Sequence, residues 1–203
     1  ADNVLIKLAP MQDISECVES LDNVHKIWVI SVKNEVKELL LQIRHLPNET
    51  PTVAAVDLTE NEPFQFETSF DSRHMEIDLR ASQQYIYQPN AAIVKAELQN
   101  RYAHKFGLAK LHANTQLFTS EVCYPDFKGR VFRVDNYISL RKKDIYEALP
   151  DKKANVISKN FPLSPDELIK KYKIQRGGDL YLIAFTDADN RKRAAICDRI
   201  VSF

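Results

Sequence analysis

Glycine is scarce in this sequence, with 4 residues among 203. Dinucleotide-binding and P-loop domains hold phosphates in loops that need several glycines close together, so no such domain is complete here. Cysteine is nearly as rare. The three cysteines, Cys17, Cys123 and Cys197, are an odd number at wide spacings, which favours reduced thiols over a disulfide framework or a zinc site. This cysteine usage predicts a cytoplasmic protein.

Long apolar runs are also missing. No stretch of about 18 apolar residues exists, so we expect no membrane-spanning helix. No basic and then apolar leader opens the chain, so we expect no secretory signal. The first residue is not Met, and an apolar run begins at Val4. We therefore expect a piece of a longer protein that starts at the edge of a strand.

Common catalytic and metal-binding motifs are absent: H-E-x-x-H, C-x-x-C and G-x-S-x-G do not occur. The five histidines are scattered, and each is interpreted as a surface or packing residue. Gly177 and Gly178 fit either an anion-binding loop or a tight turn, and the turn is favoured. Residues 187–190 lack the glycine and distal glutamate of a calcium loop, and we interpret them as a hairpin loop. We therefore predict no catalytic and no metal-binding residue in this chain.

The first 58 residues alternate between strand-like and helix-like patterns. Asp13 is a candidate N-cap for the first helix. The order of strand, helix, strand, helix, strand, joined by short connections, is typical of an α/β sheet. These elements are predicted in order at residues 3–8, 13–21, 24–32, 34–41 and 52–58.

The remainder of the chain predicts smaller α/β units. An acidic, polar stretch over 59–84 is interpreted as a junction, and a helix is predicted from 91 to 106. Ser164 and Glu167 have the spacing of a capping box and start another helix. The other predicted elements are strand 115–122, a long strand over 131–140, helix 141–149, strand 154–158, and a hairpin of strands 180–186 and 194–201.

Charge is unevenly distributed, although the whole chain carries 28 basic and 28 acidic residues. Residues 1–127 have a net charge of −7, residues 128–176 have a net charge of +7, and residues 177–203 have none. Clustered cations in one segment are typical of proteins that bind a phosphate backbone. The alternative is a solvated basic face, or one that docks on the acidic half of the chain.

Polar side chains just past the strand predicted at 154–158 extend this basic segment. Lys159 suits a phosphate, and Asn160 suits a base or sugar edge. The alternative for Asn160 is that it satisfies backbone groups of its own turn. Together with the basic segment, these residues define the candidate contacts, which are Lys128, Arg130, Lys142, Lys143, Lys159, Asn160, Lys170, Lys171 and Arg176.

Several stretches, in order along nearly the whole chain, carry a family resemblance. They are VLIKLAPMQDI (4–14), VISVKNEVKELL (29–40), YIYQPNAAIVKA (85–96), FKGRVF (127–132), ANVISKNFPLSPDEL (154–168) and RGGDLYLIAFT (176–186). The sequence resembles the C-terminal part of a bacterial group of class I S-adenosylmethionine-dependent methyltransferases with ferredoxin-like and THUMP-like domains. The resemblance implies an α/β fold, in which the C-terminal portion of a Rossmann-like methyltransferase sheet precedes small α+β ferredoxin-like and THUMP-like domains.

The resemblance also implies domain limits and a cofactor. A methyltransferase-like part is expected at 1–75, a ferredoxin-like connecting domain at 76–130 and a THUMP-like RNA-binding domain at 131–203. The parent enzyme would use S-adenosylmethionine, but the cofactor loop belongs to the missing N-terminal methyltransferase portion. We therefore expect this chain to bind no cofactor and to be inactive alone. Because an incomplete sheet leaves an unpaired strand edge, we also expect a homo-oligomer.

THUMP-type domains are associated with RNA binding in RNA-modifying enzymes. The resemblance therefore implies that this chain recognises RNA on behalf of a methyltransferase that acts on RNA. Two alternatives stay open: a protein-interaction or structural module, and a methyltransferase of a small molecule or protein that uses these domains as a substrate lid. We expect no membrane partner.

Overall fold

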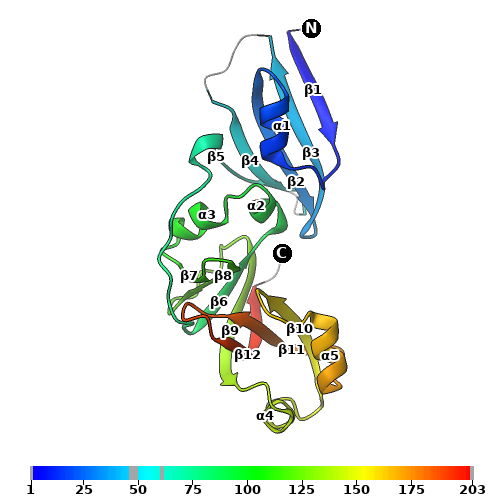
Figure 1. Cartoon of the computed structure of the whole chain (residues 1–203), viewed down its shortest axis with the longest axis vertical. Helices are drawn as coiled ribbons and strands as arrows, with labels where there is room; N and C mark the ends of the chain where they lie inside the picture. The colour runs from blue at the N-terminus through cyan, green and yellow to red at the C-terminus, as the bar shows by residue number, and fades with distance from the viewer. Residues whose placement is uncertain (1, 46–49, 60–61, 202–203) are drawn as a thin grey trace. The chain divides into compact units, whose positions relative to one another are not determined.

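The computed structural model describes residues 2–45, 50–59 and 62–201 (Figure 1). The chain folds into two compact units, each with its own sheet. The first unit contains the described residues of 1–76 and 89–105, and the second contains those of 77–88 and 106–202. Both units combine strands and helices, so the predicted mixed α/β class is confirmed.

A five-stranded sheet in the order β1-β3-β2-β4-β5 forms the first unit. Strands β2 and β4 are parallel, and every other neighbouring pair is antiparallel. The strands are β1 (Asn3–Leu8), β2 (Val24–Val32), β3 (Glu35–Arg44), β4 (Thr52–Asp57) and β5 (Phe64–Ser69). The helices are α1 (Ile14–Ser20), the 3-10 turn η1 (Phe70–Ser72), α2 (Ala91–Lys95) and α3 (Gln99–Lys105).

The helix predicted at 13–21 is confirmed as α1, and Asp13 is its N-cap. The Asp13 carboxylate accepts hydrogen bonds from the backbone N–H groups of Ser15 and Glu16, at 2.7 and 3.2 Å. The bonds from Glu16 and Ser15 lower the pKa of Asp13, because they stabilise the charged form.

The helix predicted at 34–41 is wrong, because this segment forms strand β3. Lys33 and Asn34 have φ values of 50° and 61°, the left-handed conformation that closes a two-residue hairpin between β2 and β3. Leu39 and Leu41 are both buried, two positions apart on one face of the sheet. The apolar residues of this segment fit the period of a helix and that of a strand. The hairpin turn makes the segment a strand, because it pairs β3 with β2.

The helix predicted from 91 to 106 is interrupted. Helix α2 ends at Lys95, α3 begins at Gln99, and Glu97 between them has a φ of 61°. A left-handed residue cannot continue a right-handed helix. The Glu97 carboxylate accepts a hydrogen bond from Arg73 Nε at 2.7 Å, a tertiary contact that helical spacing does not encode.

A buried polar cluster fastens the start of α2 to the sheet of the first unit. Ser31, Asp57 and Asn90 are 0%, 7% and 1% exposed. The Ser31 hydroxyl lies 3.2 Å from the Asp57 carboxylate and 3.0 Å from the side-chain oxygen of Asn90. Asn90 also caps α2 by accepting a hydrogen bond from Ala92 N at 2.8 Å. These contacts place residues 89–105 in the first unit, although the strands before and after them belong to the second.

A seven-stranded sheet in the order β10-β11-β12-β9-β6-β8-β7 forms the second unit. Strands β10 and β11 are parallel, whereas β12 is antiparallel to both of its neighbours. The strands are β6 (Tyr85–Pro89), β7 (Ala109–His112), β8 (Thr115–Ser120), β9 (Gly129–Ile138), β10 (Lys153–Lys159), β11 (Gln175–Thr186) and β12 (Lys192–Val201). The helices are α4 (Lys142–Ala148) and α5 (Pro165–Tyr172).

Each face of this sheet has its own core. On one face, helices α4 and α5 pack against β10, β11 and β12, with Ile145 and Leu168 as central contacts. On the other face no described helix contributes, and strands β6, β7 and β8 supply Ile86, Leu111 and Leu117. We call this second cluster the helix-free core. Its remaining buried members are Phe132, Ile157, Tyr181, Ile183, Phe185, Ala195 and Cys197.

Helix α5 begins as predicted. The Ser164 hydroxyl accepts a hydrogen bond from Glu167 N, and the Glu167 carboxylate accepts one from Ser164 N at 2.7 Å, which completes the capping box. The hairpin of β11 and β12 is also confirmed, and residues 187–190 form its loop.

The turn predicted at Gly177 and Gly178 is wrong, because both residues lie inside β11. Their φ values are 100° and 83°, and they fall where the pairing of β10 with β11 shifts register after Ala154. Asn155 Nδ2 donates to Gly178 O at 2.8 Å and holds this bulge against β10. Glycine is needed here for a bulge within a strand, not for a turn between strands.

Gly129 allows β9 to approach β6 closely. A Cβ atom at this position would lie 2.2 Å from the backbone oxygen of Gln88 and 2.8 Å from the Phe127 ring. Its φ of 155° is also one that side chains with a Cβ rarely adopt. The pairing of β9 with β6 therefore depends on the absence of a side chain at Gly129.

We expect Gly129→Ala to lower the free energy of unfolding by about 3 kcal/mol, because the added methyl group collides with backbone. Gly107→Ala is the matched control. Gly107 has a φ of 64° but open space around its Cβ position, so only the left-handed backbone cost of about 1 kcal/mol applies. Urea unfolding of both variants measures the difference, and equal losses would show that the β9–β6 contact is not tight.

We expect the chain to associate with itself through β1, which pairs with β3 on one side only. Val4 and Leu5 on this edge strand are 44% and 61% exposed, and an apolar strand edge promotes pairing with another chain. Light scattering over a concentration series should show association, and Leu5→Lys should reduce it. A monomer at every concentration would contradict this expectation.

Candidate nucleic-acid interface

The nine residues predicted to contact RNA all belong to the second unit, but the sheet divides them. Four lysines on α4 and α5 lie on the helix-covered side; we call Lys142, Lys143, Lys170 and Lys171 the helix lysines. The others lie on or beside strands β9, β10 and β11. These are Lys128, Arg130, Lys159, Asn160 and Arg176.

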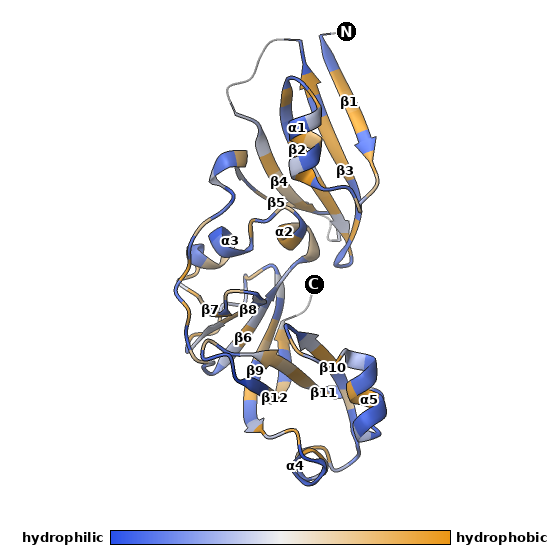
Figure 2. Ribbon diagram, viewed as in Figure 1, coloured by the Kyte–Doolittle hydropathy of each residue, from blue (hydrophilic) through white to orange (hydrophobic). Residues whose placement is uncertain are grey.

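The helix lysines are exposed, and none of them forms an ion pair with a carboxylate in the described part of the chain. Lys142 and Lys143 are in the first turn of α4, and Lys170 and Lys171 are in the last turn of α5. Figure 2 shows the ribbon of α5 coloured mostly for hydrophilic residues. Lysines without carboxylate partners can attract a polyanion, although the same helices also carry Asp144, Glu147, Asp166 and Glu167.

Arg130 and Lys159 lie on the opposite face, beside the helix-free core. Side chains alternate between the faces of a strand, so residues two positions apart share a face. The same argument adds Arg199 of β12, and we call Arg130, Lys159 and Arg199 the strand cations. Each stands two positions from a core residue of its own strand, and the pairs are Arg130 with Phe132, Lys159 with Ile157, and Arg199 with Cys197.

The strand cations influence one another. Burial lowers the pKa of Lys159, and the charge of Arg130 lowers it further. Burial also lowers the pKa of Arg130, with Tyr181 acting to raise it and Arg199 to lower it. The Arg199 guanidinium carbon lies 5.5 Å from the centre of the Tyr181 ring, which is a cation–π contact. Like charges therefore act on Arg130 and on Lys159 on this face of the sheet.

Sequence reasoning missed Arg199 and Tyr181. Arg199 lies in the electrically neutral segment 177–203, outside the basic segment. The only signal for it is the strand alternation that places Arg199 on the same face as Cys197.

Asn160 is held by side chains from other strands. Its φ is 49°, and its Nδ2 lies 3.1 Å from His112 Nδ1 and 3.2 Å from Thr115 Oγ1. Its backbone carbonyl accepts a hydrogen bond from the Thr186 hydroxyl. The amide hydrogens of Asn160 thus point at protein acceptors, and its side-chain oxygen is the group left for a base or sugar edge. The predicted RNA contact of Asn160 stays a prediction.

His112 links this loop to the β11–β12 hairpin. His112 Nδ1 also accepts a hydrogen bond from the backbone N–H of Asn114, at 3.0 Å. Because Nδ1 is an acceptor, the ring proton is assigned to Nε2, which lies 3.0 Å from Asn190 Oδ1. The loops after β7, β10 and β11 therefore meet at one hydrogen-bonded cluster. No spacing in the sequence relates His112 to Asn160 or Asn190.

Arg176 differs from the other candidates. It forms an exposed ion pair with Asp166 of α5, so part of its charge is already compensated. Lys128 is half-buried in the segment just before β9.

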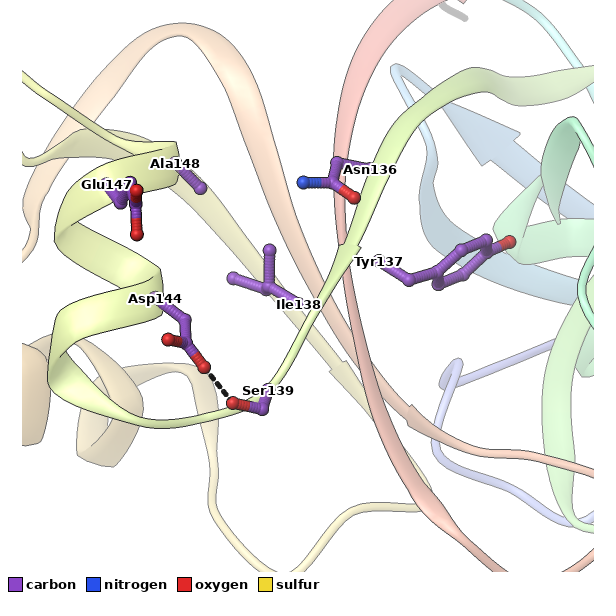
Figure 3. A pocket seen from close by; sticks show the side chains of 7 residues that line it. All are labelled: Asn136, Tyr137, Ile138, Ser139, Asp144, Glu147 and Ala148. Atoms are coloured by element: carbon purple, nitrogen blue, oxygen red, sulfur yellow. Dashed lines mark hydrogen bonds between the residues drawn. The ribbon is translucent and has the colours of Figure 1, made fainter.

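An open groove of about 430 Å³ lies between the end of β9 and α4 (Figure 3). Asp144 and Glu147 line it, and the Ser139 hydroxyl donates to the Asp144 carboxylate. Figure 3 shows the Tyr137 ring turned away from these carboxylates, and its hydroxyl donates to Gln83 O at 3.1 Å. The carboxylates repel phosphates, so this groove does not extend the candidate interface.

Two of the three cysteines are enclosed in the protein. Cys17 and Cys197 are buried, and burial raises the pKa of both thiols, which disfavours the reactive thiolate. Among the described residues, no three His, Cys, Asp or Glu side chains gather in a way that could hold a metal ion. Within the same residues, no helix has the length and apolar character needed to cross a membrane.

Two segments of the chain match family models. Residues 85–127 match a ferredoxin-like domain, and residues 129–199 match a domain described as THUMP domain-like. A solved structure of a putative methyltransferase from Porphyromonas gingivalis W83 is similar to the chain, with a TM-score of 0.89 and 30% identity. The similarity covers 98% of this chain and 51% of the other, so the chain spans about half the length of that protein. No curated protein matches the chain.

The chain is therefore similar to half of a putative methyltransferase, and it contains ferredoxin-like and THUMP-like domains. The two matched segments are not separate in the structure. Strands β6, β7 and β8 of the first segment and β9 to β12 of the second form one sheet. The domain limits expected at 1–75, 76–130 and 131–203 stay a prediction.

Asp187 fixes the hairpin loop that carries Asn190. Its carboxylate accepts hydrogen bonds from Arg193 Nε at 2.7 Å and from the backbone N–H groups of Arg191 and Asp189 at 2.9 and 3.0 Å. Burial by itself would raise the pKa of Asp187, but these hydrogen bonds and the Arg193 charge lower it on balance.

We expect Asp187 to make stability depend on pH. The folded-state pKa is below the unfolded value of about 3.9, so the stabilisation is complete above that pH and is lost as the pH falls through the folded-state pKa. Urea unfolding at pH 7, 4 and 3 should show a smaller pH dependence for Asp187→Asn than for the unmodified chain. Asp189→Asn, which alters an exposed ion pair with Arg191, is the control and should leave the dependence unchanged. If the free energy of unfolding of Asp187→Asn depended on pH as strongly as that of the unmodified chain, the lowered pKa of Asp187 would be contradicted.

Proposed function

We propose that this chain is the RNA-recognition region of a bacterial class I S-adenosylmethionine-dependent methyltransferase that modifies RNA. The observation that carries the proposal is the set of exposed helix lysines without carboxylate partners among the described residues. RNA presents a regular array of phosphate charges, and lysines that release its counterions supply affinity independent of sequence.

The positions of Lys142 and Lys143 support a role outside the fold. Both are in the first turn of α4, where the helix dipole disfavours positive charge. Lys170 and Lys171, in the last turn of α5, are favoured by the same dipole. The two lysines of α4 therefore do not stabilise their helix. A bound polyanion would offset their unfavourable interaction with the helix dipole.

The comparisons with known proteins support two parts of the proposal, the THUMP-like domain and the link to a methyltransferase. The THUMP-like match at 129–199 includes all four helix lysines. The similarity to a putative methyltransferase gives the context in which RNA recognition would serve methyl transfer. That similarity covers 51% of the other protein, so the reaction and its substrate belong to the proposal.

The residues of this chain do not fit S-adenosylmethionine. A nucleotide-binding loop needs glycines between a strand and a following helix. Gly107 follows α3, Gly129 packs on Gln88, and Gly177 and Gly178 lie in β11. No step of methyl transfer can therefore be assigned to this chain, and the cofactor would be held by the rest of the parent protein.

The task left for this chain is to bind and orient RNA. The helix lysines would hold the backbone of a structured RNA through its phosphates. Bases in a duplex are shielded by stacking, so a nucleotide to be methylated on its ring would have to leave the stack. Phosphate contacts to the flanking RNA backbone would fix the position at which that nucleotide is presented to the methyltransferase.

We expect the full chain to bind a labelled structured RNA with micromolar affinity at low salt and with a steep loss of affinity at physiological salt. Lys142→Ala with Lys143→Ala, or Lys170→Ala with Lys171→Ala, should weaken binding to all RNA sequences alike. Each pair should reduce the slope of log K against log salt by about 1.5, because two phosphate contacts are lost. Fluorescence anisotropy at several salt concentrations measures both quantities.

Lys95→Ala with Lys105→Ala, in the helices of the first unit, removes the same charge and is the matched control. It should leave the slope unchanged. An equal reduction in this control would mean that total charge, not the helix lysines, sets binding. No RNA binding at low salt would overturn the proposal and favour a protein-interaction module or a substrate lid.

A further inference from the structure

We propose that a small pocket of the first unit binds a primary ammonium group through side-chain oxygens that lie near the junction of α2 and α3. The pocket has a volume of about 280 Å³, and two stretches of that unit line it. We call it the amide pocket, and its lining residues are His74, Met75, Glu76, Glu97, Gln99 and Asn100. Nothing in the proposed function requires this pocket, because the helix lysines belong to the other unit.

Two side-chain oxygens of the amide pocket lack a hydrogen-bond partner. Gln99 Oε1 and Asn100 Oδ1 are buried atoms, and neither accepts a hydrogen bond within the described residues. The Asn100 amide is fixed in its orientation, since its Nδ2 donates to Met75 O at 2.8 Å. An acceptor that loses water without gaining a donor destabilises the fold. Two such acceptors in residues that line one pocket indicate that the pocket receives N–H donors from a ligand.

Glu97 adds a carboxylate that is held in place. Its Oε2 accepts a hydrogen bond from Arg73 Nε at 2.7 Å, and two further hydrogen bonds fix the Arg73 guanidinium. No described residue donates to the other carboxylate oxygen, Oε1. The left-handed φ of 61° at Glu97 turns the chain between α2 and α3, and the side chains of Glu97, Gln99 and Asn100 line the same pocket after this turn.

Three acceptors match the donors of an ammonium group. An alkylammonium ion has three N–H donors and no acceptor, and the pocket offers one carboxylate and two amide oxygens. Hydrogen bonds from a charged donor are stronger than those between neutral groups, so the unpaired oxygens favour a cation over a neutral amine. The flexible thioether side chain of Met75 provides an apolar surface for the alkyl chain of the ligand.

The charges of the lining residues also favour an organic cation. Glu76 and Glu97 are the acidic residues of the lining, and both would repel a phosphate. His74 is the only basic residue among the described lining residues, and its Nε2 lies 3.5 Å from Glu97 Oε2. No three His, Cys, Asp or Glu side chains gather in the described part of the chain in a way that could hold a metal ion. A metal ion is therefore a weaker candidate than an ammonium group.

The test is a titration of the full chain with n-butylammonium chloride at about pH 8, where primary amines are charged and an ordinary histidine is neutral. Sodium chloride keeps the ionic strength constant. The chain has two methionines, so a methyl-labelled sample reports on Met75 in the pocket and on Met11, which is 88% exposed and serves as the internal reference. We expect saturable NMR shifts of the Met75 methyl group and of the Asn100 side-chain amide, and no change at Met11.

Tetramethylammonium chloride is the matched control ligand, because it carries the same charge without an N–H donor. It should cause no saturable shift at Met75. Absent or non-saturable shifts with n-butylammonium would overturn the pocket. Equally tight binding of tetramethylammonium would overturn the role of the unpaired oxygens.

Gln99→Met removes one unpaired oxygen and keeps a flexible side chain of similar length. It should weaken n-butylammonium binding by about tenfold, because one charge-assisted hydrogen bond is lost. It should not lower the free energy of unfolding measured in urea, because Gln99 Oε1 has no partner in the unliganded chain. Gln116→Met changes a half-buried glutamine of the second unit and should leave binding unchanged. Unchanged binding in Gln99→Met, or an equal loss in Gln116→Met, would contradict the proposal.

A primary ammonium group can come from a small free amine or from a lysine side chain of another protein. Titrations with 1,4-diaminobutane and with a lysine blocked at both its α-amino and carboxyl groups compare these sources, and the tighter ligand identifies the source. Binding of neither, or displacement of n-butylammonium by calcium chloride at equal ionic strength, would overturn the ammonium site. Failure here is distinguishable from failure of the proposed function, because Gln99→Met should leave RNA binding by the helix lysines unchanged.

Discussion

The second unit depends on the close approach of β9 to β6, which the missing side chain of Gly129 permits. This contact joins strands from the ferredoxin-like segment to strands from the THUMP-like segment. Neither segment alone closes the helix-free core, since Ile86 comes from one and Phe132 from the other. The same contact sets the register of Arg130, the residue that follows Gly129. A backbone constraint at a glycine thus decides where the Arg130 cation stands.

The sheet formed in this way separates positive charge into two environments. On the helix-covered side, the lysines of α4 and α5 are exposed to solvent. On the other side, Arg130 and Lys159 emerge from strands beside a core and lose part of their hydration. One basic segment of the sequence therefore supplies two positively charged surfaces, one exposed to solvent and one partly desolvated. Total charge cannot distinguish them, because the distinction arises from strand alternation and helix packing.

Local signals in the sequence predicted those elements whose ends are fixed by their own residues. Asp13 and the pair of Ser164 and Glu167 set helix starts through hydrogen bonds within one turn, and the structure contains both caps.

The predictions from sequence fail where tertiary contacts decide the local structure. Residues 34–41 follow a left-handed hairpin turn at Lys33 and Asn34, and their apolar pattern fits two periods. Glu97 breaks a helical pattern because it turns toward Arg73, which is remote in sequence. For the candidate interface, charge counting found Arg130 and Lys159, whereas Arg199 is found only by strand alternation from Cys197.

The loop after β10 shows how the two segments cooperate beyond the sheet itself. Lys159 ends β10, and Asn160 follows in a left-handed conformation that costs free energy unless the surroundings fix it. His112 and Thr115, from the ferredoxin-like segment, bond to the Asn160 amide, and Thr186 of β11 bonds to its carbonyl. Three strands thus hold the backbone at the point where Lys159 leaves the sheet. A lysine side chain is flexible, and a fixed backbone at its base restricts how far its charge can move from Arg130. Salt screens half-buried charges less than solvated ones, so the repulsion between Lys159 and Arg130 depends less on ionic strength than interactions of the exposed helix lysines do.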